Sequence, residues 1–123
     1  MPAEKTSTLF IALTNPEPGK EAEYNDWYDN IHLPEIVATE GFVSARRFKL
    51  SGAQMESFAI DKQPYKYMAI SELESGAVAA GKGQQIMDNL IAAIPGMKVL
   101  PVIDMANGWG YLVESIGDTV HAK

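Results

Sequence analysis

The apolar residues of this chain change their spacing several times, and the order of those changes constrains the fold more than any other feature. Thr8–Thr14 (TLFIALT) alternates with a period of two, and both alternating sets are apolar, which predicts a central β-strand. Beyond two prolines and a glycine the spacing predicts an amphipathic helix, with an apolar stripe of Tyr24, Trp27, Tyr28 and Ile31. Pro34 predicts that this helix kinks or ends near His32 and Leu33 and then resumes briefly over residues 35–39.

The rest of the chain repeats these two kinds of spacing. Strands are predicted at residues 41–50, 67–73 and 108–114, and a second helix carries the stripe Met87, Leu90, Ile91 and Ile94. We expect a loop at residues 53–65, a short extra strand or an irregular arm at 97–107, and a frayed tail at 115–123. The order β-α-β-β-α-β predicts one α+β domain over residues 1–123. Its arrangement is ferredoxin-like, with two helices on one face of a four-stranded antiparallel sheet.

Such a sheet has a second face that no helix covers. Here it is expected to carry some of the aromatic residues Tyr65, Tyr67, Trp109 and Tyr111. An uncovered apolar face is typical of an interaction surface, and pairing with a second copy gives a homodimer. Tyr67, Trp109 and Tyr111 therefore have two interpretations, as core or dimer-interface residues and as the lining of a substrate cavity.

The charge balance excludes some classes of partner. The chain has 10 Lys+Arg against 16 Asp+Glu, a net charge of -6, which argues against binding to nucleic acid or to an anionic membrane. No cysteine is present, so disulfides and thiolate metal sites are excluded. The polar first residues and the lack of a long apolar run predict a soluble, cytoplasmic protein without a signal peptide or membrane span.

The segment from Asn15 to Phe48 carries a recognisable pattern: WYDNIHLPEI, then GF, then RRF. It resembles the EthD-like proteins of the dimeric α+β barrel superfamily, and the spacing W-Y-D-x-x-H-x-P is its most informative part. The resemblance implies a homodimer with one small apolar cavity per subunit, into which His32 points. The superfamily includes cofactor-free monooxygenases, polyketide cyclases, muconolactone-type isomerases and dehydratases that act on small hydrophobic molecules.

His32 is the residue best suited to chemistry, because an imidazole with a pKa of about 6.5 both takes and gives a proton at neutral pH. Tyr28 and Asp29 precede it by four and three residues, so both are expected on the same helix surface. Asp29 would then fix the imidazole tautomer, and Tyr28 would donate to a developing oxyanion. In the alternative interpretation His32 only caps the helix carbonyls where Pro34 interrupts the hydrogen bonds.

Two further hypotheses concern the helix and the next strand. Trp27 is expected to pack in the core. Arg46 and Arg47 are adjacent on a strand and must point to opposite faces. An arginine among apolar residues requires either an ion pair with an acidic side chain or an anionic ligand. The resemblance favours Arg47 as the clamp for a substrate carboxylate.

We therefore expect a cofactor-free lyase, isomerase or cyclase acting on a small, aromatic or polyketide-like carbonyl compound. The catalytic residues would be His32, Tyr28 and Asp29, and the substrate would be bound by Arg47, Tyr67, Trp109 and Tyr111. No metal site is predicted, because the ligand types and spacings are missing. The alternatives are a non-catalytic ligand-binding or scaffolding dimer and a cofactor-free monooxygenase, and a haem with His32 as its axial ligand stays open.

Overall fold

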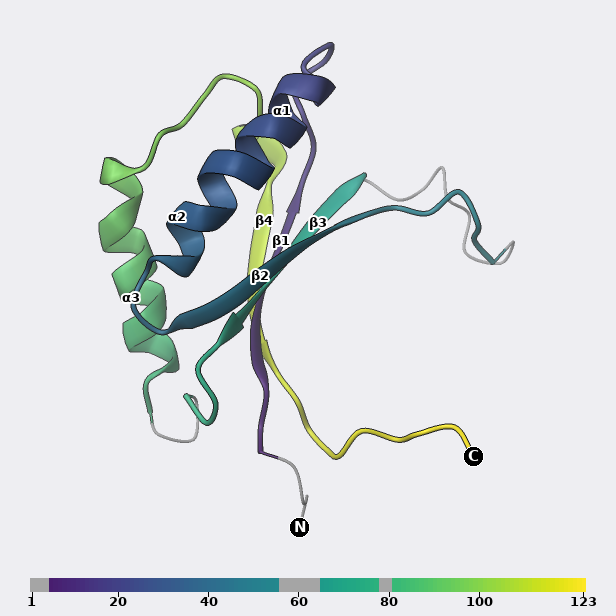
Figure 1. Ribbon diagram of the computed structural model, residues 1–123, viewed down its shortest axis with the longest axis vertical. Coiled ribbons are helices and arrows are strands. Elements are labelled where there is room, and N and C mark those ends of the chain that lie inside the picture. Colours follow the sequence, from purple (N-terminus) through teal and green to yellow (C-terminus); the bar gives the residue numbers. More distant parts are fainter. Residues whose placement is uncertain (1–4, 56–64, 78–80) are drawn as a thin grey trace.

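The computed structural model describes residues 5–55, 65–77 and 81–123, and it has the predicted α+β architecture (Figure 1). The strands are β1 (Thr8–Thr14), β2 (Phe42–Lys49), β3 (Tyr67–Leu73) and β4 (Trp109–Glu114). The helical elements are α1 (Glu21–Trp27), the π-helical turn η1 (Tyr28–His32), α2 (Leu33–Val37), α3 (Gly83–Ala93) and the 3₁₀ turns η3 (Ile94–Gly96) and η4 (Met105–Asn107). No helix in these described ranges is long and apolar enough to cross a membrane.

The four strands form one antiparallel sheet in the order β2-β3-β1-β4, which is the ferredoxin-like arrangement. The prediction that Thr8–Thr14 is central is confirmed, because β1 pairs with β3 on one side and with β4 on the other. Ile11 on β1, for example, is directly opposite Ile70 on β3 and Tyr111 on β4. Residues opposite one another across strands share a face, so this register defines the two faces of the sheet.

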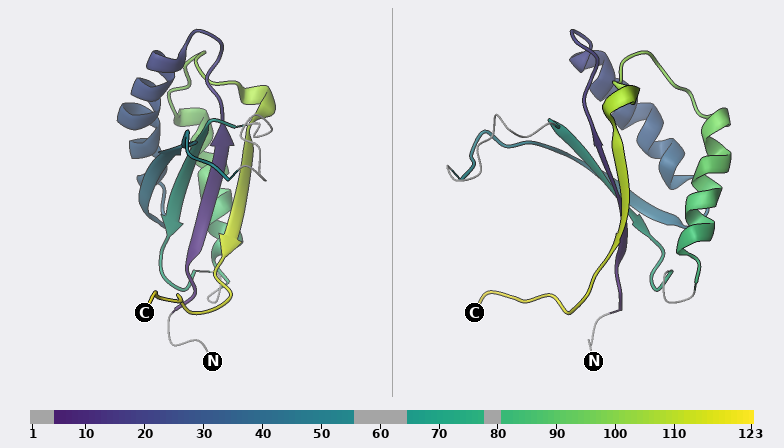
Figure 2. Two further views of the ribbon diagram at one scale, coloured as in Figure 1. Left: turned by 90° about the vertical axis from the view of Figure 1, so that its right-hand side faces the viewer. Right: turned by 180° about the vertical axis from the view of Figure 1, so that it is seen from behind.

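Helices α1, α2 and α3 all lie on one face of the sheet, as Figures 1 and 2 show. Two apolar clusters lie beneath them. The first lies under α1 and η1 and is built around Tyr24, Trp27, Tyr28, Tyr67 and Ala69. The second lies under α2 and α3 and is built around Ile36, Phe42, Leu73, Ile86 and Leu90. The helices are therefore held by side chains spaced three and four residues apart.

The first helix does not end at Pro34. It passes through the wide turn η1, in which the N–H of Leu33 donates to the carbonyl of Tyr28, five residues earlier, and it continues as α2. Pro34 falls in the first turn of α2, directly after the wide turn η1. The predicted interruption near His32 is thus a π-helical turn, a feature often found at functional sites.

The second helix packs on a different stripe from the predicted one. Leu90 is buried as expected, but Ile86 is also buried, whereas Ile91 is 63% exposed. The reason is that the Ile86 side chain packs directly on the backbone of Gly41, which has no Cβ. A Cβ added to Gly41 would lie 2.4 Å from Cγ1 of Ile86. A contact of this kind depends on the tertiary structure, so the local periodicity did not predict it.

The face without helices is largely apolar. Trp109 and Tyr111 lie on it, opposite Leu13 and Ile11 of β1, while Tyr67 is buried on the helix side. The segment 97–107 forms no extra strand within the sheet and makes a single bridge, between Pro16 and Ile103. The tail 115–123 has no regular structure and is exposed, and most of the predicted loop, residues 56–64, lies outside the described residues.

Candidate functional site

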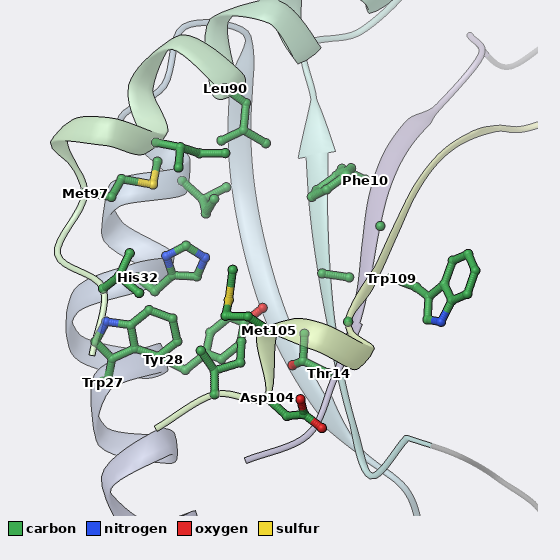
Figure 3. A pocket seen from close by; sticks show the side chains of 17 residues that line it. Phe10, Thr14, Trp27, Tyr28, His32, Leu90, Met97, Asp104, Met105 and Trp109 are labelled. Carbon is green, nitrogen blue, oxygen red and sulfur yellow. The ribbon is translucent and has the colours of Figure 1, made fainter. Parts of the chain in front are cut away.

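A cavity of about 290 Å³ lies between the helices and the covered face of the sheet (Figure 3). Strand β1 supplies its floor through Phe10, Ala12 and Thr14, because these alternate residues face the helices. The opposite wall comes from the first helix, through Trp27, Tyr28 and His32. The side chains between them are mostly apolar, so the cavity suits a small hydrophobic molecule.

The segment 97–107 forms another wall of this cavity through Met97, Ile103 and Met105. Two backbone hydrogen bonds attach the segment to the turn after β1: Glu17 N–H donates to the Val102 carbonyl, and Asp104 N–H donates to the Asn15 carbonyl. These lining residues were missed at the sequence level, because an irregular segment has no periodicity from which its path can be predicted.

His32 projects from the helix into the cavity, as Figure 3 shows. Its ring stacks on the Trp27 indole, with 4.7 Å between centroids and 14° between planes, and it meets the Tyr28 ring edge-on at 5.1 Å. Burial lowers the pKa of His32 below its ordinary 6.5, an effect that the nearby Glu35 carboxylate partly offsets. The imidazole is therefore neutral at neutral pH and has a free electron pair for a proton.

Tyr28 borders the same cavity and is almost fully buried. Burial raises the pKa of its phenol to about 12, so the hydroxyl keeps its proton and can donate a hydrogen bond. Close by, the hydroxyls of Tyr24 and Thr14 are hydrogen-bonded to each other, and Thr14 also lines the cavity. The site thus combines a proton acceptor, His32, with a hydroxyl donor, Tyr28.

Asp29 does not contact His32. Its Oδ1 accepts a hydrogen bond of 2.8 Å from Nη1 of Arg47, and its side chain is 56% exposed. The wide turn η1 explains the difference, because each residue of a π-helical turn advances less around the axis than in an α-helix. Three residues therefore fall further short of a full turn, which leaves Asp29 and His32 farther apart on the helix surface. The acidic side chain that does approach the imidazole is Glu35, one turn later in the chain, with Oε1 3.8 Å from Nδ1.

Arg47 points to the helix side of the sheet and Arg46 to the open side, where its guanidinium lies over the Phe48 ring at 5.4 Å. Besides Asp29, the guanidinium of Arg47 donates to Oδ1 of Asn25 at 2.7 Å. It also lies 4.7–5.3 Å from the ring centres of Tyr24, Tyr28 and Tyr67. Of the two interpretations of this arginine, the ion pair within the protein is the one seen, and Arg47 does not line the cavity.

The three predicted aromatic binding residues are not brought together. Tyr67 lies beside Arg47, and its hydroxyl accepts a hydrogen bond from Nδ2 of Asn25 at 3.4 Å. Trp109 borders the cavity, but its ring points away from it in Figure 3 and stacks on Tyr111, with 6.1 Å between centroids. Trp109 and Tyr111 therefore present their rings on the open face of the sheet.

Asp104 is a lining residue that the sequence did not single out. Figure 3 places its carboxylate at the same end of the cavity as Thr14, and Oδ2 accepts a hydrogen bond of 2.8 Å from Asn107. Within residues 5–55, 65–77 and 81–123, no group of three or more His, Cys, Asp or Glu side chains is placed to hold a metal ion.

Comparison with known proteins identifies no family for this chain. No protein-family model and no curated protein matches the chain. Among solved structures, the crystal structure of HapK from Hahella chejuensis is similar to it, with a TM-score of 0.49 and 13% sequence identity. The similarity covers 94% of this chain and 99% of that one.

Proposed function

We propose that this chain is an EthD-like, cytoplasmic homodimer of the dimeric α+β barrel type. It is a cofactor-free enzyme that transfers a proton on a small hydrophobic carbonyl compound, aromatic or polyketide-like, bound in the cavity on the helix side of the sheet. The observation that carries this proposal is the imidazole of His32, which is directed into a mostly apolar cavity where burial lowers its pKa. Perturbed titratable groups in such cavities are candidates for acid–base catalysis.

The chemistry follows from the two polar groups of the first helix. His32 takes a proton from the carbon next to the carbonyl, so that a C–H bond breaks and an N–H bond forms. The electron pair moves onto the carbonyl oxygen, which the Tyr28 hydroxyl stabilises with a hydrogen bond. Return of the proton to another carbon gives an isomer, and departure of a leaving group with its electron pair gives a lyase reaction.

The open face of the sheet supports the homodimer. Its exposed side chains include Trp109, Tyr111 and Phe48, which are 56%, 46% and 43% exposed. The same face carries one residue of each charge, Arg46 and Glu72, on the neighbouring strands β2 and β3. A two-fold interface buries the same surface patch of both copies, so the patch must complement itself. A largely apolar face that carries one positive and one negative side chain meets this requirement.

A carbonyl compound with an acidic C–H group provides the test, and benzoylacetone is a suitable probe because it is aromatic and its enol absorbs ultraviolet light. We expect the protein to accelerate the interconversion of its keto and enol forms. His32→Asn is expected to remove about 100-fold or more of that acceleration. The other histidine gives the matched control, because His121 lies in the exposed tail and His121→Asn is expected to keep the full rate. An unchanged rate in His32→Asn would refute the mechanism.

The second candidate is a non-catalytic ligand-binding or scaffolding dimer. It is favoured by the small number of titratable side chains among the described residues that line the cavity, namely Tyr28, His32 and Asp104. If benzoylacetone binds in the cavity but its tautomers interconvert no faster than in buffer, this candidate is preferred. Dioxygen uptake in the same mixture would favour the cofactor-free monooxygenase instead.

A further inference from the structure

Glu35 faces His32 from the next turn of the same helical segment, and neither the mechanism above nor the sequence pattern uses it. Its Oε1 lies 3.8 Å from Nδ1 of His32. Both atoms are buried, and the described part of the chain offers neither of them a hydrogen-bond partner. A buried polar atom without a partner is costly, so the two atoms are each other's natural partners.

The other end of this arrangement is fixed by the segment after α3. The backbone N–H of Lys98 donates to Oε2 of Glu35 at 2.8 Å, and the backbone carbonyl of Lys98 accepts the indole N–H of Trp27, also at 2.8 Å. Trp27 in turn stacks on the imidazole. The main chain of one residue thus holds both the carboxylate that faces His32 and the ring on which His32 rests.

We propose that Glu35 is the positioning residue of His32. A closer approach of about 1 Å brings the two atoms into hydrogen-bond range, with Nδ1–H donating to Oε1. The proton of the neutral ring is then held on Nδ1, and Nε2 is left as the proton acceptor on the cavity side. This inference rests on the proposed function, because it assigns the tautomer that a general base requires.

The surroundings of His32 support Glu35 over other charged groups. Asp29, the acidic residue expected in this role, is engaged with Arg47. Asp104 and Tyr28 line the same cavity, but of the charged groups in the described ranges Glu35 is the one that acts on the pKa of His32, which it raises against the effect of burial. A carboxylate in this position stabilises the protonated ring and makes the imidazole a stronger base.

Nitrogen-15 NMR of histidine-labelled protein tests the assignment without any substrate, because the two ring nitrogens have different shifts in the two neutral tautomers. The variant is Glu35→Gln, whose amide oxygen can still accept the Lys98 N–H while its NH₂ group faces Nδ1. We expect the proton on Nδ1 in the wild type and on Nε2 in Glu35→Gln, together with a lower His32 pKa. Asp29→Asn is the matched control and is expected to keep the wild-type tautomer and pKa.

Two results would overturn the proposal: a wild-type ring with its proton on Nε2, or a His32 tautomer and pKa that Glu35→Gln leaves unchanged. If Glu35→Gln fails to fold, the wild-type tautomer alone decides. Enolisation of benzoylacetone supplies a second readout, which is expected to fall about 100-fold in Glu35→Gln, since the base on the cavity side is lost. Because the NMR result needs no substrate, the proposed function can fail while the assignment of Glu35 stands, and the reverse also holds.

Discussion

Trp27 connects the candidate base to the rest of the cavity. Its ring stacks on the imidazole of His32, and its indole N–H donates a hydrogen bond to the carbonyl of Lys98, in the segment 97–107 that forms another wall of the cavity. The family resemblance implied that His32 reaches a cavity, and the helical stripe predicted that Trp27 packs in the core. Neither could predict that Asp29 turns toward Arg47, because three-residue spacing places side chains together only in a regular α-helix and the structure contains a π-helical turn.

The lowered pKa of His32 makes the stability of the protein depend on pH. Between the folded-state pKa and the ordinary value of 6.5, the unfolded chain binds a proton that the folded chain does not. Above about pH 6.5 the imidazole is neutral in both states and makes no contribution. Stability should therefore fall as the pH drops through about 6.5 and level off below the folded-state pKa.

Urea unfolding at about pH 7.5 and about pH 5, at one protein concentration, measures this effect. The loss of stability on acidification should be smaller in His32→Asn than in the wild type, while His121→Asn should lose as much as the wild type. Equal losses in all three proteins would mean that the burial of His32 does not oppose its charging.

At the level of elements, local patterns were enough for the strands. The ranges 8–14 and 67–73 are strands β1 and β3 as predicted, since alternation is a property of the strand itself. The packing of α3 could not be predicted in the same way, because Ile86 is buried against Gly41, which lies 45 positions earlier in the chain. The cavity wall from segment 97–107 could not be predicted either, because an irregular segment has no periodicity.

Gly41 offers a test of that packing. Its φ of +102° is unfavourable for any side chain, and a Cβ there would overlap Ile86. Gly41→Ala should therefore lower the free energy of unfolding by about 2–4 kcal/mol, the sum of backbone strain and overpacking. Gly19 is the matched control, since its φ is +77° but nothing lies within 4 Å of an added Cβ.

For Gly19→Ala only the backbone effect remains, and we expect a loss of about 1 kcal/mol. Chemical denaturation of the two variants gives the comparison directly. Similar losses in both would show that Ile86 moves aside without cost, and the explanation given for the shifted stripe of α3 would be wrong.

At the level of the whole molecule, the sheet has one covered and one open face, and the two faces have different proposed roles. The covered face holds the cavity, whereas Trp109 and Tyr111 on the open face belong to the proposed dimer interface. The order of elements predicted both faces. It did not predict which aromatic side chain lies on which face, since that depends on the registers of β3 and β4 against β1.

Sedimentation analysis tests the interface. The wild type is expected at twice the chain mass of 13.4 kDa, and Tyr111→Lys should shift it toward the monomer, since two-fold symmetry repeats each new charge in the interface. Ile91→Lys is the control, because Ile91 is also exposed but lies on α3. A wild-type monomer, or a Tyr111→Lys dimer as stable as the wild type, would contradict the proposed interface.

The central claim is that a small aromatic carbonyl compound binds between the helices and the sheet, against His32. Intermolecular nuclear Overhauser effects from the phenyl protons of bound benzoylacetone test it most directly, because they report which protein protons lie beside the ligand. We expect contacts to the ring protons of His32 and to Phe10 on the floor of the cavity. Contacts to Trp109 and Tyr111 on the open face, without any to His32, would contradict it.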